Sequence, residues 1–257
     1  MSDTQAPVLP LFYSKVVGVN PSLHGGLRLN RAAGYGFAAG AASIPVGLGE
    51  FALVARHYPI VFAAGAVPAP VALTGINALG NLFVDAAGAW RADAYVPAYV
   101  RAYPFIFVED PARSTTYVGM DEGAVCLSHE VGERLFEDDK PTPALSEAVQ
   151  FCSSFRDNIT AATAFANALE SAGLLQEEEA TVNFTGGGTT RVRGFKVIRA
   201  DRLDQVADET FLDWRRRGWL GAIYAHLHSA GNWARLIDLA VGRGAVGRGA
   251  MGQGKGG

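Results

Sequence analysis

The sequence predicts an α+β fold: an antiparallel or mixed β core over residues 9–128, followed by a mainly helical C-terminal half that contains one β-hairpin. Two observations lead to this prediction. Strand and turn signals give way to helical periodicity near Pro141. One phrase also occurs twice, 45 residues apart, as Arg56-His57-Tyr58-Pro59-Ile60-Val61-Phe62 and as Arg101-Ala102-Tyr103-Pro104-Phe105-Ile106-Phe107.

The start of the core is expected to contain a strand over residues 9–19 and a hairpin over the glycine-rich segment 25–39, where apolar residues alternate. The Gly-Leu-Gly stretch at 47–49 resembles part of a dinucleotide-binding loop. That fingerprint also needs an acidic residue about 20 positions later to hold the ribose. No acidic residue lies between Glu50 and Asp85. The glycines therefore predict a tight helix entry, and we expect no cofactor.

Each copy of the repeated phrase predicts a helix, a stop and two strands. The segments before the copies, 48–57 and 97–102, suit short helices. Tyr-Pro ends each helix, because proline disfavours the α region at the residue before it. The apolar runs that follow are rich in β-formers, and second strands are expected at 71–76 and 116–120. We interpret the repeat as an internal helix–strand duplication within one domain.

The longest helix is expected over residues 142–173. Thr142 supplies the N-cap, Pro143 occupies the first turn, where its missing N–H costs nothing, and Gly173 ends the helix. Apolar residues recur every three or four positions and form one face for the core. They are Leu145, Val149, Cys152, Phe155, Ile159, Ala162, Ala166 and Leu169.

A hairpin is expected next, over residues 180–198, with its turn at the glycine run 186–188. Asp201 and Asp208 are expected to cap two further helical segments. The last helix should span residues 219–239 and bury one apolar stripe. The stripe consists of Leu220, Ile223, Tyr224, Leu227, Ala230, Ala234 and Ile237.

Composition and charge exclude several classes of protein. Hydrophobic residues make up 49% of the chain and charged residues 18%, as in globular chains with a sizeable core. The net charge is −3, and nucleic-acid binding, which needs a basic face, is not expected.

Cys126 and Cys152 predict buried thiols in a reducing cytoplasm. We assign residues 1–240 to a single domain and the glycine-rich residues 241–257 to a disordered tail.

One run of residues, 58–84, carries no charge over a length that could span a bilayer. The run contains three prolines and three glycines, and these break a helix that would have to satisfy its own backbone in lipid. Buried strands joined by turns explain the run better, so no membrane span is expected.

The histidines predict no metal site, and no catalytic residue is assigned. His226 and His228 are two positions apart on an expected helix and point in different directions. In the segment His129-Glu130-Val131-Gly132-Glu133, Glu133 stands where the zinc-protease helix has its second histidine. The sequence also contains no Gly-x-Ser-x-Gly elbow for a serine nucleophile.

Aromatic and polar side chains concentrate in one short stretch. They are Trp90, Tyr95, Tyr99, Arg101 and Tyr103, with Asn81 and Asp85 just upstream. Rings beside an amide, a carboxylate and a guanidinium are common in surfaces that bind carbohydrates, peptides or aromatic ligands. Core packing is the alternative, because Tyr99 and Tyr103 lie one helical turn apart and can both face inward. A buried arginine must be paired, and Asp85 or a ligand anion is the expected partner of Arg101.

Three parts of the chain carry a resemblance to a known family. They are Tyr58-Pro59-Ile60-Val61-Phe62; the series Asn81-Leu82-Phe83-Val84, Trp90, Tyr95-Val96-Pro97-Ala98 and Arg101-x-Tyr103-Pro104-Phe105; and Tyr224-Ala225-His226-Leu227-x-Ser229-x-x-Asn232. These motifs resemble the signature of the SapC-like bacterial proteins over roughly residues 10–240. The resemblance implies an association with surface-layer export, and genes for flavin-dependent halogenase-like proteins and outer-membrane receptors nearby.

Two functions fit these observations. The first is a non-catalytic cytoplasmic accessory or binding protein of a surface-layer, peptide or nutrient-uptake pathway, with a protein or peptide partner. The second is an enzyme, or an enzyme component, that works with a flavin-dependent halogenase-like partner on an aromatic or peptide substrate. A hydrogen-bonded structural role is the alternative for His226. The predicted binding surface consists of Asn81, Asp85, Trp90, Tyr95 and Arg101, with His226 and Asn232 from the last helix as neighbours.

Overall fold

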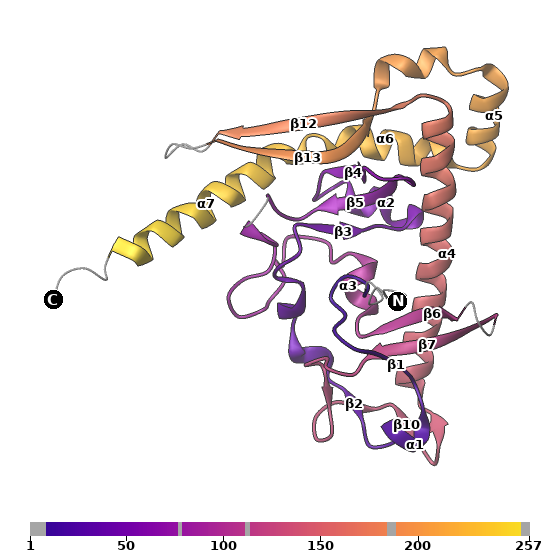
Figure 1. Cartoon of the computed structure of the whole chain (residues 1–257), viewed down its shortest axis with the longest axis vertical. Helices are drawn as coiled ribbons and strands as arrows, with labels where there is room; N and C mark the ends of the chain where they lie inside the picture. Colours follow the sequence, from indigo (N-terminus) through magenta and orange to yellow (C-terminus); the bar gives the residue numbers. More distant parts are fainter. Residues whose placement is uncertain (1–8, 77–78, 111–113, 184–188, 253–257) are drawn as a thin grey trace, which may run out of the picture.

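The computed structural model describes residues 9–76, 79–110, 114–183 and 189–252 (Figure 1). It has the predicted α+β fold, with helices and antiparallel sheets. The glycine turn predicted at 186–188 lies outside the described residues.

The largest sheet has five strands in the order β12-β13-β4-β5-β3. They are β3 (Ser43–Pro45), β4 (Ile60–Ala63), β5 (Ala69–Leu73), β12 (Leu175–Asn183) and β13 (Thr189–Ile198). The predicted late hairpin is therefore present as β12 and β13. It joins the sheet where Phe195 and Lys196 of β13 lie opposite Ala63 and Phe62 of β4. One sheet thus unites strands from both halves of the chain.

A second sheet has the order β1-β7-β6, and shorter strands complete the β structure. The strands of this sheet are β1 (Val16–Gly18), β6 (Phe105–Asp110) and β7 (Thr115–Asp121). The shorter strands are β2 (Arg28–Leu29) between β8 (Leu127–Ser128) and β9 (Glu133–Arg134), and β10 (Phe136–Glu137) beside β11 (Lys140–Pro141).

The helices described are short, apart from three. The short ones are α1 (Pro21–His24), η1 (Arg31–Ala33), η2 (Gly36–Ala38), η3 (Leu48–Glu50), α2 (Phe51–Val54), α3 (Ala98–Ala102), η5 (Ala200–Gln205) and α5 (Asp208–Arg216), where η marks a 3₁₀ helix. The longer ones are α4 (Pro143–Ser171), α6 (Trp219–Ser229) and α7 (Asn232–Gly252).

Both copies of the repeated phrase form the predicted order of elements. In the first copy α2 is followed by the hairpin β4–β5, and in the second α3 is followed by the hairpin β6–β7. The two hairpins belong to different sheets. Their common order agrees with a shared building block, and the duplication itself stays a prediction.

Helix α4 runs along one side of the molecule and connects its two ends (Figure 1). The predicted caps are confirmed: the Thr142 hydroxyl accepts from the N–H of Leu145, and Gly173 adopts a φ of 68°, a conformation that favours glycine. Phe165, in the second half of α4, packs edge-on against Phe51 and Trp219. The first half of α4, which includes Leu145, belongs to a different apolar cluster.

The two apolar clusters do not divide the chain near residue 140. One contains Phe62 and Phe165 together with the five-stranded sheet, and the other contains Phe105 and Cys152. Each cluster thus combines residues from before and after residue 140. The assignment of residues 1–240 to a single domain stays a prediction.

The Gly-Leu-Gly stretch lies against α4. The N–H of Gly49 donates to the Asn158 side chain at 2.9 Å, and a Cβ at Gly47 would approach the Asn158 Cβ to 2.7 Å. Close approach of a helix, together with the entry into η3, explains the two glycines.

The hairpin predicted over 25–39 is wrong, and the first strand is confined to Val16–Gly18. Strand β2 has two residues and pairs with β8 and β9, which come a hundred residues later. The N–H of Asn30 donates to the carbonyl of Cys126, and the Asn30 side chain caps η1. These distant partners replace the local pairing that the alternating apolar residues suggested.

The single last helix predicted over 219–239 is also wrong, because α6 ends at Ser229 and α7 begins at Asn232. The Asn232 side chain donates to the carbonyl of Tyr58 at 3.1 Å and so directs the chain into α7. The buried face of α6 also differs from the predicted stripe. Tyr224 is 50% exposed, whereas His226 and Ser229 are buried.

The helical segments after β13 start earlier than predicted. Arg199 and Ala207 occupy the N-cap positions, and Asp201 and Asp208 lie in the first turns. Helix α7 extends to Gly252, into the segment expected to be a disordered tail, and the Arg243 side chain donates to the carbonyls of Asn81 and Val84. Residues 253–257 lie outside the described part. No helix among the described residues is long and apolar enough to cross a membrane.

We expect Thr142→Ala to lower the free energy of unfolding by about 1 kcal/mol, because the N-cap acceptor of α4 is lost. Urea denaturation followed by circular dichroism measures the change. Thr160→Ala, at an exposed position inside the same helix, is the control and should be neutral or slightly stabilising, since alanine has the higher helix propensity. Equal losses for the two variants would contradict the assigned cap.

Candidate functional site

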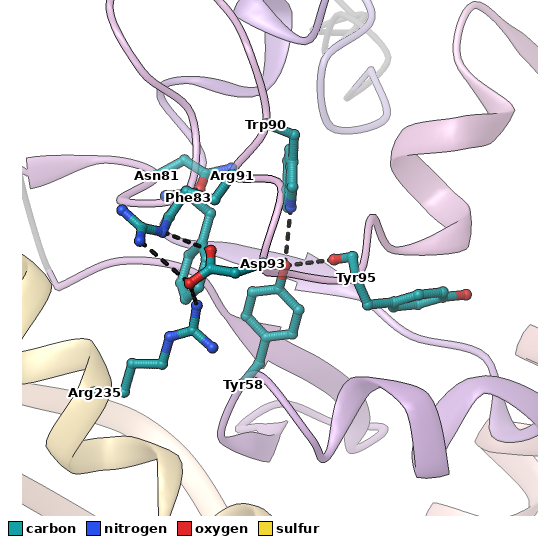
Figure 2. A network of polar contacts seen from close by, with 8 residues as sticks. All are labelled: Tyr58, Asn81, Phe83, Trp90, Arg91, Asp93, Tyr95 and Arg235. Carbon is teal, nitrogen blue, oxygen red and sulfur yellow. Dashed lines mark hydrogen bonds and ion pairs between the residues drawn. The ribbon is translucent and has the colours of Figure 1, made fainter.

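The Tyr58 hydroxyl connects two of the predicted site residues. Tyr58 is fully buried, directly before β4. Its hydroxyl donates to the carbonyl of Tyr95 and accepts from the indole N–H of Trp90 at 3.0 Å (Figure 2). Burial raises the pKa of Tyr58 well above its usual range, so the hydroxyl keeps the proton it donates. The segment from Trp90 to Tyr95 is thereby held against the five-stranded sheet.

Trp90 supports the loop that follows β2. Its ring meets the Tyr35 ring edge-on, with centroids 5.8 Å apart. The N–H of Tyr35 donates to the carbonyl of Gly88 at 2.7 Å, and a Cβ at Gly34 would approach the same oxygen to 2.9 Å. Gly34 also has a φ of 76°. The backbones of the two turns therefore touch, and only glycine fits at this position.

A chain of hydrogen bonds leads from the core to Arg101. The buried carboxylate of Glu50 accepts from the backbone N–H groups of Gly47 and Ala98, at 2.9 and 2.8 Å, and from the Tyr95 hydroxyl at 3.0 Å. Nη2 of Arg101 donates to the same hydroxyl at 2.7 Å. Burial raises the pKa of Glu50, although these donors and the Arg101 charge oppose the rise. Tyr95 thus joins a buried acid to an exposed cation.

Arg101 lies at the wall of an open groove of about 410 Å³, within the range of small-molecule pockets. We call this cavity the Arg101 groove. It lies between the loop that contains Tyr35 and Phe37, helix α3 and the start of α4. Its lining includes Leu29, Asn30, Arg31, Tyr35, Phe37, Val100, Arg101, Tyr103, Phe105, Cys126, Glu147 and Phe151.

Aromatic rings form much of the groove wall. Phe37 and Tyr103 are stacked, with centroids 4.0 Å apart and an interplanar angle of 23°. The Tyr103 hydroxyl donates to the buried Asp121 at 2.8 Å. The guanidinium of Arg101 lies over the Phe151 ring, 4.9 Å from its centroid. Asp121, outside the cavity, therefore fixes Tyr103, while Phe37 and Arg101 each pack against another ring of the lining.

The predicted pairing of Arg101 with Asp85 is wrong. The exposed Asp85 carboxylate accepts from the N–H groups of Ala87 and Ala89, each at 2.9 Å, and so stabilises its own turn. Arg101 instead donates to the Tyr95 hydroxyl and to the carbonyl of Val96. The Asp85 carboxylate is already hydrogen-bonded to backbone donors two and four residues ahead, and it therefore does not require a distant cation as a partner.

Asn81 is a core residue whose side chain hydrogen-bonds to the backbone of two other residues. It is fully buried, its amide donates to the carbonyl of Ala38 at 3.2 Å, and its oxygen accepts from the N–H of Phe83 at 2.9 Å. Beside it, Asp93 pairs with Arg91 at 3.1 Å and with Arg235 of α7 at 2.9 Å (Figure 2). These contacts tie the loop before α3 to the last helix.

His226 and Asn232 do not belong to the groove lining. Nε2 of the buried His226 accepts from the N–H of Ile198 at 3.0 Å, and its ring packs against Phe62. Asn232 donates to the carbonyls of Ala55 and Tyr58. The structure thus brings Trp90, Tyr95 and Arg101 together and places His226 and Asn232 at the joint between α6 and the sheet.

Three residues of the site differ from what the sequence predicts. Tyr35 and Phe37 line the groove and do not belong to a hairpin, and Glu50 supports Arg101 through Tyr95. The one available signal for Glu50 was its position three residues after Gly47, which is the spacing of a capping box. Nothing local marked Phe37 as a neighbour of Tyr103.

Cys126 in the groove lining and Cys152 behind it are both poorly suited to covalent chemistry. Burial raises the pKa of the Cys126 thiol to about 11 and that of Cys152 to about 12, so neither is a ready nucleophile near neutral pH. Among the described residues, no group of three or more histidine, cysteine or acidic side chains could hold a metal ion. Aromatic rings and the guanidinium of Arg101 can hold a ligand and orient it.

One comparison places the chain among known proteins. A family model described as SapC matches residues 19–236. No curated protein and no solved structure matches the chain.

We expect Tyr58→Phe to lower the free energy of unfolding by about 2–4 kcal/mol, because the Trp90 indole and the Tyr95 carbonyl would both lose a buried partner. Denaturant titration measures the loss. Tyr117→Phe, at a tyrosine of β7 that is 41% exposed, is the matched control and should change little. A similar small effect in both variants would show that the Tyr58 hydroxyl does not hold the segment.

Stability should fall on acidification between pH 6.5 and about pH 4. Burial lowers the pKa of His226 from 6.5 to about 4, so in this window the unfolded chain binds more protons than the folded one. The contribution to the free energy of unfolding is about 3 kcal/mol, present above pH 6.5 and lost as the pH approaches 4.

His226→Gln tests this dependence, because glutamine can still accept from Ile198 but does not titrate. Denaturant titrations at several pH values should show a flatter profile for the variant than for the natural chain. Identical profiles would mean that other groups cause the acid sensitivity.

Proposed function

The chain belongs to the SapC family, and we propose that it acts as a non-catalytic accessory protein that binds a protein or peptide partner in the Arg101 groove. The observation that carries this proposal is the groove itself, in which aromatic rings surround one oriented guanidinium. Aromatic and arginine side chains are the residues that contribute most to binding energy at protein interfaces. A surface-layer, peptide or nutrient-uptake pathway is the proposed setting.

We place the protein in the cytoplasm as part of the same proposal. Both cysteines are free and buried, which fits a reducing compartment. Of the predicted site residues, Arg101 is then the ligand-side group, and the Tyr95 hydroxyl orients it. Trp90 is 8% exposed, and it acts by supporting Tyr35.

A second function uses the same groove. The aromatic lining would also suit an aromatic substrate that the protein presents to a flavin-dependent halogenase-like partner. In that case the isolated protein, or its complex with the partner, would support turnover of a metabolite.

Capture of partners from native cells tests the proposal. A stoichiometric partner should be retained by the natural chain and lost by Arg101→Ala and Phe37→Ala, because both side chains line the groove. Arg215→Ala removes an exposed arginine of α5, outside the groove, and should retain the partner. Mass spectrometry identifies the partner, and thermal melting shows that each variant is folded.

The proposal is wrong if Arg101→Ala captures the same partner as the natural chain. Turnover of a metabolite by the purified protein would favour the second function. Trp90→Ala is unsuitable as a binding variant, because it removes a buried donor to Tyr58 and should mainly lower the melting temperature.

A further inference from the structure

We propose that the Arg101 groove receives the C-terminal residue of a peptide chain, with an aromatic side chain against its rings and the terminal carboxylate on Arg101. This inference rests on the proposed function and narrows its ligand to one chemical class. Three features of the groove carry it: the orientation of the cation, the aromatic rings and the charges of the rim.

The cation is oriented before any ligand arrives. Nε of Arg101 donates to the carbonyl of Val96 at 3.1 Å and Nη2 to the Tyr95 hydroxyl at 2.7 Å, while Phe151 covers one face of the guanidinium. No described residue accepts a hydrogen bond from Nη1, which leaves donors for a ligand on a side chain that lines the cavity. A carboxylate matches the planar donor geometry of arginine, and the fixed orientation reduces the entropy lost on binding.

The rest of the groove favours an aromatic ring. Phe37 and Tyr103 are stacked on each other, and Asp121 fixes the Tyr103 hydroxyl. Val100 and Phe105, which are almost fully buried, contribute apolar surface to the lining. Aromatic pairs gain energy beyond their buried area when their rings are offset or edge-on, so a wall that contains Tyr35, Phe37, Tyr103 and Phe151 favours an aromatic ligand.

The charges of the rim favour a chain end over a free amino acid. A free amino acid would also need a partner for its ammonium group. Among the described lining residues the one acid is Glu147, which is exposed and would contribute little. Arg31, the other cation of the lining, already pairs with Glu133 at 3.3 Å. Because Arg31 and Glu147 are both exposed, the groove is open to solvent, and a preceding chain can leave it there.

Isothermal titration calorimetry on the full chain, with short synthetic ligands, tests the inference. The probes are N-acetyl-Ala-Ala-Phe as the free acid, the same tripeptide as its C-terminal amide, N-acetyl-Ala-Ala-Ala as the free acid, and free phenylalanine. We expect the aromatic acid to bind at least tenfold more tightly than each of the other three. The amide lacks the charge, the alanine peptide lacks the ring, and phenylalanine carries an unpaired ammonium group.

Variants assign the carboxylate to its partner. In Arg101→Gln the acid and the amide should bind with equal affinity, and Arg101→Lys should restore part of the difference because the charge returns without the planar fork. Arg215→Gln, outside the groove, should behave as the natural chain.

The outcomes separate this inference from the function on which it rests. If the acid and the amide bind with equal affinity, the groove does not recognise the terminal carboxylate, and it remains a peptide-binding groove. If phenylalanine binds as tightly as the tripeptide, the ligand is a free amino acid and not the end of a peptide chain. If none of the probes binds, the inference is wrong, and Arg101-dependent partner capture then decides the proposed function independently.

Discussion

The position of the groove wall depends on one buried hydroxyl group. Tyr58 lies in the core directly before β4, where an unpaired polar group would be costly, and it finds its two partners in the segment that leads to α3. By holding the Tyr95 carbonyl, it also fixes the Tyr95 side chain between Glu50 and Arg101. The backbone carbonyl of Tyr58 accepts a hydrogen bond from the Asn232 side chain at the start of α7. Sheet, groove and last helix therefore share a single anchor.

The parts of the fold that local rules decide were predictable. Tyr103-Pro104 ends α3, and Thr142 and Gly173 bound α4, because caps and proline act on their nearest neighbours. Helix α2 already ends at Val54, before Tyr58-Pro59 is reached. The segment after β2 and the break after Ser229 were not predictable. Their conformations depend on hydrogen bonds to residues about 100 and 170 positions away, and periodicity contains no information on such partners.

The same distinction applies to the candidate site. Proximity in sequence was enough to group Trp90, Tyr95 and Arg101, and the structure places them behind and beside one groove. Asp85 was near in sequence as well, yet it satisfies itself within its own turn. Phe37 and Phe151 come from distant segments, and only the tertiary fold brings them to Arg101 and Tyr103.

The length of helix α4 has a consequence for how the molecule unfolds. With 29 residues at about 1.5 Å each it is about 43 Å long, and its two halves are buried in different clusters. If one cluster unfolds, the half of α4 that it buries becomes exposed, while the other half remains packed in the second cluster. The two clusters should therefore unfold cooperatively.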